Sequence, residues 1–352
     1  MQQTTNYFVM KKRHIIVAII AIIILAGLGV CAHLYKVYVK DPIATADTTI
    51  KVYITPGLSS DSLHNILAQQ IDTDKARKIV EFMYNDNYDY NARKGYYELK
   101  GTTSIYRAAR KLAAGSQTPI TFTFNNLRLI DQLIERIDET LYMSADSIEA
   151  LLKDDALCAQ YGFDTTTIIA MFLPDTYEFY WTVSPQRFME RMHQYYEQFW
   201  NDERRQKAQR IGLTPIEVST LASIVEEETI KSDEMPIVAG LYLNRLRRNI
   251  PLQADPTVKY AVGDFSLQRI LNKHLATPSP YNTYLNTGLP PSPIRIPSKT
   301  AIDAVLNYRQ HNYLYMCAKE DFSGYHNFAT TLSQHNRNAE RYHNALNRRG
   351  IK

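Results

Sequence analysis

The first hydrophobic pattern along the chain is a run without any charged residue, Ile15–Ala32, with the sequence IIVAIIAIIILAGLGVCA. As a helix these residues rise about 27 Å, close to the roughly 30 Å hydrocarbon core of a bilayer. A helix that covers a soluble core keeps a polar face, and this run has none. The pattern therefore predicts a transmembrane helix over residues 15–34, with Tyr35 as an aromatic residue at its end.

The alternative for this run is a cleaved signal peptide, since Val30 and Ala32 are small residues at a suitable spacing. The apolar run is longer than the usual 7–15 residues of a signal peptide, which favours a retained anchor. Three basic residues in the tail 1–14 precede the run, against Lys36 and Lys40 after it. A short basic tail and a long C-terminal part favour a cytoplasmic N-terminus.

After the anchor, residues 35–48 form a predicted tether, and strand and helix patterns then alternate over residues 49–142. Alternating apolar positions predict strands and a period near 3.6 predicts helices. This pattern indicates one or two small α+β modules. The predicted strands are 51–54, 95–99 and 120–124, and the predicted helices begin at 60–61, 105 and 128.

Residues 143–213 read as a helical connecting region, interrupted by the aromatic stretch 171–181. The region 214–352 opens with Thr214-Pro215-Ile216-Glu217, a capping box with proline at the first helical position. The overall fold class is thus α+β. Further predicted elements are helices at 236–248, 298–311 and 332–348, strands at 313–318 and 325–329, and a proline-rich loop at 278–297.

Composition excludes several classes of function. The formal net charge is +4, and without the basic tail the balance is 37 basic against 36 acidic residues. A nucleic-acid partner is therefore not expected, because such binders carry a concentrated basic face. Metal and cofactor motifs are absent, and the spacing of Cys31, Cys158 and Cys317 suits no zinc site. Two unpaired core thiols are favoured over a Cys158–Cys317 disulfide.

Three consecutive glutamates, Glu226–Glu228, stand late in the capped helix. Successive helical residues differ by about 100°, so the three side chains point in different directions. Glu227 is expected to face water, Glu226 to lie at the edge of the apolar stripe, and Glu228 to lie partly inside it. Apolar neighbours raise the pKa of a carboxyl, so Glu226 or Glu228 could hold a proton for catalysis. The alternatives without a catalytic role are that the glutamates form a solvated acidic face, or that Glu228 pairs with Arg245 or Arg247. The stripe consists of Val218, Leu221, Ala222, Ile224 and Val225.

Three histidines near the C-terminus, His326, His335 and His343, lack the spacing of metal ligands and are expected to be structural. No sequence motif indicates a serine hydrolase, a zinc protease or a phosphate-binding loop.

Several motifs in order resemble the YceG-like family of endolytic murein transglycosylases. They are LASIVEEET (221–229), AGLYLNRL (239–246), LQADPTVKY (252–260), TPSPYNT (277–283), TGLPPSPI (287–294), GYHNF (324–328) and SQHN (333–336). Fainter matches are FLPDTY (172–177) and ITPG (54–57).

This resemblance implies an enzyme of the bacterial inner membrane that cuts the MurNAc–GlcNAc β-1,4 bond of nascent glycan strands without water. The product carries a 1,6-anhydro end, one glutamate serves as acid and base, and the substrate's N-acetyl group stands in for a second carboxylate. The resemblance assigns the catalytic role to Glu226 and a supporting role to Glu228.

The resemblance also implies roles for other residues. Gln253, Asp255, Tyr281, Asn282 and Thr283 are expected to line the substrate groove, and Asn244 and Arg245 to brace it. The modules before residue 142 resemble LysM-like domains that hold glycan. Implied partners are peptidoglycan strands, the membrane, and peptidoglycan synthases or proteins of the division or elongation machinery.

The rival hypotheses are a glycan-binding scaffold that has lost turnover and a hydrolase on the same fold. One departure from the family pattern is Ile169-Ala170, where relatives often carry Glu-Gly. The region 72–93 is also longer than the family pattern.

Overall fold

The computed structural model describes residues 2–85, 93–125, 127–267 and 269–350, with backbone only for residues 2–12 and 85. The chain divides into two compact units. The first contains residues 1–120 and 178–182, and the second contains residues 121–177 and 183–352. Residues 121–142, grouped with the first module in the sequence analysis, thus belong to the second unit. The structure is α+β, with three two-stranded sheets among the described residues.

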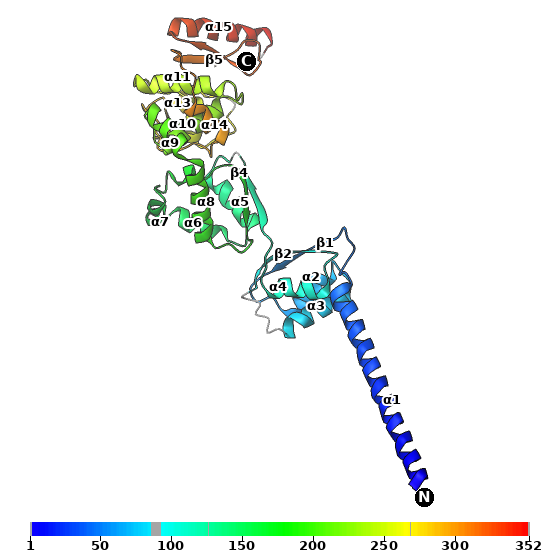
Figure 1. Cartoon of the computed structure of the whole chain (residues 1–352). Helices are drawn as coiled ribbons and strands as arrows, with labels where there is room; N and C mark the ends of the chain where they lie inside the picture. Colours follow the sequence, from blue (N-terminus) through cyan, green and yellow to red (C-terminus); the bar gives the residue numbers. More distant parts are fainter. Residues whose placement is uncertain (1, 86–92, 126, 268, 351–352) are drawn as a thin grey trace. The chain divides into compact units, whose positions relative to one another are not determined.

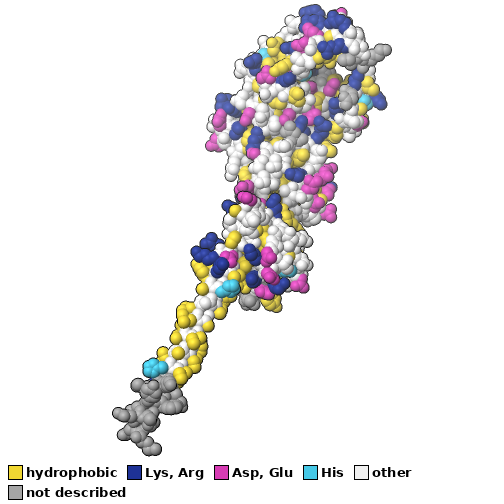
Figure 2. Space-filling model, turned by 90° about the vertical axis from the view of Figure 1, so that its right-hand side faces the viewer, with side chains coloured by type: hydrophobic (Ala, Val, Ile, Leu, Met, Phe, Trp, Pro, Cys, Tyr) yellow, Lys and Arg dark blue, Asp and Glu magenta, His cyan; other side chains and the backbone are white. Residues whose placement is uncertain are grey.

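The N-terminal helix α1 (Gln2–Tyr35) contains the charge-free run. It is the one helix of the described residues long and apolar enough to cross a membrane, and none of that stretch is buried by the rest of the protein. Figure 2 shows hydrophobic side chains along most of the part of this helix whose side chains the structure describes. Both observations fit a single-pass membrane anchor.

The first unit is built on the antiparallel pair β1 (Thr49–Ile54) and β2 (Gly95–Lys100) (Figure 1). Alternate residues of β1 are fully buried, because a strand directs successive side chains to opposite faces. Three helices supply the rest of this core: α2 (Ser60–Ala68), α3 (Thr73–Asn85) and α4 (Ile105–Ala113).

Residues 36–48, the predicted tether, are packed against this core. A π-helix, η1 (Lys36–Lys40), continues directly from α1. Ile43 is 1% exposed, its backbone N–H donates to the Thr103 carbonyl, and Ala44 donates to the Gly101 carbonyl. An added Cβ at Gly101 would lie 1.9 Å from the Thr45 carbonyl oxygen, so only glycine permits this close approach.

Strand β3 (Ile120–Phe124), which belongs to the second unit from Thr121 onward, pairs with β4 (Asp175–Phe179). Strand β4 lies inside the aromatic stretch, where the sequence predicted only an interruption between helices. The helices of this part are α5 (Ile130–Thr140), α6 (Ala145–Leu152), α7 (Asp155–Gln160), the short 3₁₀-helix η2 (Ile168–Met171), α8 (Pro185–Phe199) and α9 (Asp202–Ile211).

Helix α10 (Pro215–Glu228) is the centre of the second unit, and every residue from Val218 to Glu226 is buried. The predicted capping box is confirmed. Thr214 accepts from the Glu217 N–H, and the Glu217 carboxylate accepts from the Thr214 N–H. Around it pack α11 (Met235–Arg247), α12 (Asp255–Val262), α14 (Lys299–Leu306) and α9, and the short α13 (Asn272–Leu275) contacts α12.

The chain ends in a hairpin and a covering helix, as the sequence predicted. Strands β5 (Tyr315–Ala318) and β6 (His326–Ala329) are antiparallel. Helix α15 (Leu332–Arg348) packs on both strands (Figure 1). Cys158 and Cys317 are both free thiols.

Candidate active site

The last turn of α10 directs its three glutamates to three different partners. Glu226 is buried, at 9% exposure. Its Oε2 accepts a 2.9 Å hydrogen bond from the Ser298 N–H, at the start of α14, and lies 3.6 Å from Nε of Arg295. The Glu226 carboxylate therefore fixes the start of a neighbouring helix.

Glu227 does not face water, so this prediction is wrong. Its side chain is only 15% exposed, because two arginines cover it. Arg128 donates to both carboxylate oxygens, at 2.8 and 2.7 Å, and Arg295 donates to Oε1 at 2.6 Å. The Arg128 guanidinium also lies over the Phe265 ring. Sequence reasoning missed this pairing because its members are 99 and 68 residues apart.

Glu228 points into a cavity of about 400 Å³, and it is the glutamate of the three that lines it. Its Oε1 accepts a 2.6 Å hydrogen bond from the hydroxyl of Tyr242 on α11. Tyr242 is 2% exposed, so its ring position is fixed by packing. The side-chain partner of Glu228 is therefore Tyr242, and not Arg245 or Arg247 as in the alternative that the sequence left open. The cavity lining consists of Glu228, Leu241, Tyr242, Arg245, Leu252, Gln253, Asp255, Tyr284, residues 315–318, His326, Leu332 and His335.

Burial raises the pKa of Glu228 to about 7. The hydrogen bond from Tyr242 opposes this rise, because it stabilises the charged carboxylate, and the negative charge of Asp255 adds to it. A carboxyl with this pKa is protonated in a large fraction of molecules near neutral pH. It can therefore give up a proton and take one back, which is what general acid–base catalysis requires.

Two further pairs shape the cavity beside Glu228. Asp255, at the start of α12, accepts a 2.7 Å hydrogen bond from the Tyr284 hydroxyl. Arg245 donates to Oε1 of Gln253 at 2.6 Å and to the carbonyls of Pro251 and Leu314. Gln253 has a φ of 52°, a left-handed backbone conformation that side chains other than glycine rarely adopt. Such strain is often found at functional sites, where the surroundings hold it.

Two histidines that the sequence treated as structural also line this cavity. His326 is 2.8 Å from Oε2 of Glu234 through Nδ1, and its backbone N–H donates to Oε1 of the same carboxylate. His335 lies against the Tyr315 ring, and its buried Nδ1 has no hydrogen-bond partner among the described residues. Both stand in motifs that resemble the family, GYHNF and SQHN, which was the signal available in the sequence.

The other predicted site residues lie around the cavity rather than in it. Asn282 and Thr283 are fully or almost fully buried and hold backbone: Asn282 donates to Leu275 and Thr277, and Thr283 accepts from the Ala254 N–H. Asn244 donates to the carbonyls of His311 and Tyr313.

Tyr281 lines a separate cavity of about 350 Å³, where its ring packs on Tyr260 and its hydroxyl contacts Ser292.

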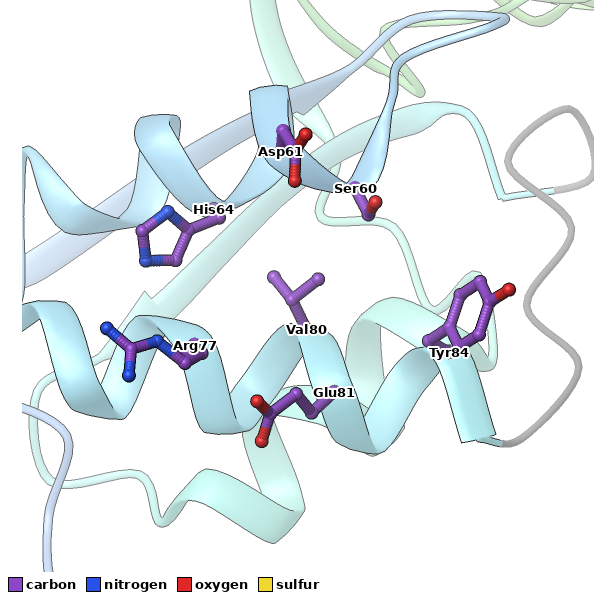
Figure 3. A pocket seen from close by; sticks show the side chains of 7 residues that line it. All are labelled: Ser60, Asp61, His64, Arg77, Val80, Glu81 and Tyr84. Atoms are coloured by element: carbon purple, nitrogen blue, oxygen red, sulfur yellow. The ribbon is translucent and has the colours of Figure 1, made fainter.

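A third cavity, of about 530 Å³, lies in the first unit between α2 and α3 (Figure 3). Asp61 and His64 face it from α2, and Arg77, Glu81 and Tyr84 face it from α3. Among the described residues, no group of three or more His, Cys, Asp or Glu could hold a metal ion.

Comparison with known proteins identifies the family. A family model described as the YceG-like family matches residues 52–341, most of the chain. The chain belongs to the YceG-like family. A relative from Bacillus subtilis, named endolytic murein transglycosylase, is 29% identical, over 90% of this chain and 91% of the relative. A relative of the same name from Streptococcus pneumoniae is 26% identical, over 88% of this chain. The match spans 62% of that relative, less than two thirds of its length.

Among solved structures, a crystal structure of a yceG-like protein from Listeria monocytogenes has a TM-score of 0.55 and 26% identity. The match covers 82% of this chain and 98% of that chain. The similarity to the YceG-like family thus extends from sequence to fold.

The raised pKa of Glu228 predicts a pH-dependent change in stability. The folded protein binds this proton more tightly than the unfolded chain, so the associated stability is complete below pH 4.5 and is lost as pH rises through about 7. Glu228→Gln stays neutral and avoids the loss. It should raise the free energy of unfolding of the full chain in detergent at pH 8, by at most about 3 kcal/mol given ~1.4 kcal/mol per tenfold change in proton affinity, and change it little at pH 4. The melting temperature of the two proteins at each pH measures this difference.

Glu226→Gln is the matched control, because it makes the same side-chain change on the same helix, about half a turn before Glu228. This substitution weakens the contact with Arg295, so it should not raise the stability of the protein at pH 8. A Glu228→Gln protein no more stable than wild type at pH 8 would contradict a raised pKa of Glu228.

Proposed function

We propose that this member of the YceG-like family is a membrane-anchored lyase that cuts peptidoglycan glycan strands internally, with Glu228 as its catalytic acid and base. The observation that carries the proposal is the position of Glu228, which lines a cavity with a pKa near 7 and a fixed hydrogen-bond partner. The names of the two bacterial relatives supply the substrate class, murein.

In the first step, the protonated Glu228 donates its proton to the glycosidic oxygen between MurNAc and GlcNAc. The C1–O bond then breaks, the GlcNAc hydroxyl leaves, and the positive charge that develops at C1 is stabilised by the substrate's own N-acetyl group. In the described part of the cavity, the second acidic group beside Glu228 is Asp255, which is engaged by Tyr284. This arrangement supports a mechanism with one catalytic carboxyl.

In the second step, the oxygen on C6 of MurNAc attacks C1, and its proton passes to the Glu228 carboxylate. The product carries a 1,6-anhydro ring, no water is consumed, and Glu228 returns to its protonated form. Gln253 and Arg245 are proposed to hold the sugar or its substituents, because they face the same cavity.

Glu228 takes the place of Glu226 in this proposal. Glu226 is engaged by Ser298 and Arg295 and does not line the cavity, so it has no free path to a sugar. We propose that Glu226 instead supports the start of α14. The first unit is proposed to face the outside of the inner membrane, with the N-terminus in the cytoplasm.

The central test compares two isosteric variants on purified glycan strands. Glu228→Gln should lower the formation of anhydro-ended fragments by about 10²-fold or more, because it removes the proton donor. Glu226→Gln should keep most of the activity if it still folds. Mass spectrometry of the products measures the amount of anhydro-ended fragments that each variant forms. Fragments with reducing ends would instead indicate a hydrolase, and an active Glu228→Gln protein would disprove the assignment.

The pH profile tests the environment of Glu228 independently. Removing the Tyr242 hydroxyl should raise the pKa of Glu228, because the hydrogen bond stabilises the charged form. Tyr242→Phe should therefore move the alkaline limb of kcat/KM to higher pH. Asp255→Asn should move it to lower pH, because the Asp255 charge raises the pKa of Glu228.

Tyr308→Phe provides the control for the pH profiles, since Tyr308 bonds Arg247 outside the cavity and should leave the limb unchanged. Shifts of Tyr242→Phe and Asp255→Asn in the same direction would argue against Glu228 as the titrating group.

We also propose that the first unit is LysM-like and holds the glycan strand. Its β1-α2-α3-β2 core carries the cavity of Figure 3, where carboxylates, Ser60 and Tyr84 offer sugar hydroxyls both hydrogen-bond partners and an aromatic face. The Tyr84 side chain is 71% exposed, so it is available to a ligand.

The prediction for this cavity is that Tyr84→Ala lowers retention on insoluble peptidoglycan. It should be measured in the Glu228→Gln background, where the strand is not cut. Tyr180→Ala is the matched control, because Tyr180 is 55% exposed, belongs to the same unit and lies outside the cavity. Equal retention of the two variants would exclude a role for this cavity in glycan binding.

A further inference from the structure

The junction between α1 and the first unit shows where that unit lies relative to a bilayer. With His33, Leu34 and Tyr35 added to the charge-free run, residues 15–35 rise about 31 Å as a helix, close to the roughly 30 Å thickness of the hydrocarbon core. With this run in the membrane, Tyr35 stands at the edge of the hydrocarbon. The five residues of η1 then extend about 6–8 Å further, which is about the depth of one headgroup layer.

The first unit is joined to this helix without a flexible linker. In η1, Val37 and Tyr38 pack against the core of the unit. Just beyond it, the Lys75 ammonium on α3 donates a 2.7 Å hydrogen bond to the Pro42 carbonyl. Because η1 is held at headgroup depth and is also part of the folded unit, the surface around it must lie at the same depth.

That surface has the chemistry of a membrane interface. It surrounds a hollow of about 510 Å³ between η1, α3 and α4, with Tyr35, Val39 and Tyr106 exposed at 54%, 39% and 40%. Phe82 packs edge-on against Tyr106 within it. Aromatic rings with a polar tip are enriched at this depth of membranes because they suit both the hydrocarbon edge and the headgroups.

Basic groups accompany these rings. Lys78 lines the hollow together with Glu81, and Lys36 and Lys40 are the first and last residues of η1. The Lys40 ammonium lies 6.0 Å from the centre of the Tyr35 ring. Figure 2 shows basic side chains gathered where α1 meets the unit. Long lysine side chains can extend to headgroup phosphates while their stems cover apolar surface.

We propose that the face formed by η1, α3 and α4 is seated in the headgroup layer of the bilayer, with the aromatic residues in the interface and Lys40 and Lys78 on lipid phosphates. The face is thus a second membrane contact beside the spanning helix. This inference rests on the proposed membrane anchor, but it does not depend on the enzymatic activity. It fixes which side of the first unit faces the membrane.

The test uses the full chain in phospholipid nanodiscs, with a photo-crosslinking phenylalanine analogue at one position at a time. The probe at Tyr106 should form phospholipid adducts, seen by mass spectrometry, at about the level of a probe at Leu25 in α1. The matched control is Tyr53, which is 44% exposed, on β1 of the same unit, against Tyr96 and Trp181. Its adduct yield should be at least about tenfold lower, because it lies outside the interface.

The outcomes separate the two proposals. If the probe at Leu25 forms adducts but the adduct yield at Tyr106 is no higher than at Tyr53, the inference is overturned and the proposed membrane anchor is retained. If the probe at Leu25 forms no adducts, both proposals are overturned. Charge reversal, Lys40→Glu with Lys78→Glu, should lower the Tyr106 yield several-fold and leave the Leu25 yield unchanged. An unchanged Tyr106 yield would refute the lysine–phosphate contacts.

Discussion

The second unit depends on one constraint, which is that three adjacent carboxylates at the end of a buried helix must each find a partner. An ionised carboxylate removed from water without a partner is strongly unfavourable, so each glutamate of the last turn of α10 fixes something else in place. Glu226 holds the start of α14 through Ser298, and Glu227 holds two arginines from distant segments. Glu228 receives a single hydrogen bond, from Tyr242. This one hydrogen bond does not offset the loss of hydration, so burial raises the pKa of Glu228.

Local sequence signals predicted the elements well and their long-range pairing poorly. The capping box at Thr214, the terminal helix 332–348 and the hairpin before it needed only neighbouring residues, and each is present. Strand β4 was missed because its pairing partner, β3, is about fifty residues earlier, and the aromatic residues around it fit a helix equally well. Likewise, no residue near Glu227 in the sequence indicates that Glu227 pairs with Arg128, because the two are 99 residues apart.

The candidate site shows the same division between local and distant information. Helical periodicity placed Glu228 partly inside the apolar stripe and Glu226 at its edge, and it left both open as the catalytic group. The family resemblance then assigned the role to Glu226. In the structure, residues 295–298 contact the carboxylate of Glu226, which does not line the cavity. Glu228 does line it, together with residues of α11, α12 and the β5–β6 hairpin. Burial raises the pKa of Glu228, which is the physical effect that the sequence analysis expected of apolar neighbours. The roles of His326 and Tyr284 depended on contacts across 92 and 29 residues, which periodicity does not encode.

A carboxyl poised near pH 7 has a physical disadvantage that its surroundings must offset. Above that pH the burial of Glu228 opposes folding, yet the Tyr242 hydroxyl limits the effect by stabilising the charged form. A stronger partner, such as the guanidinium pairs of Glu227, would hold the carboxylate ionised and leave no proton to donate. A purely apolar pocket would hold it protonated and weaken it as a base. One neutral donor, held by a buried ring on α11, lies between these extremes, and it permits the same group to give a proton and then recover it.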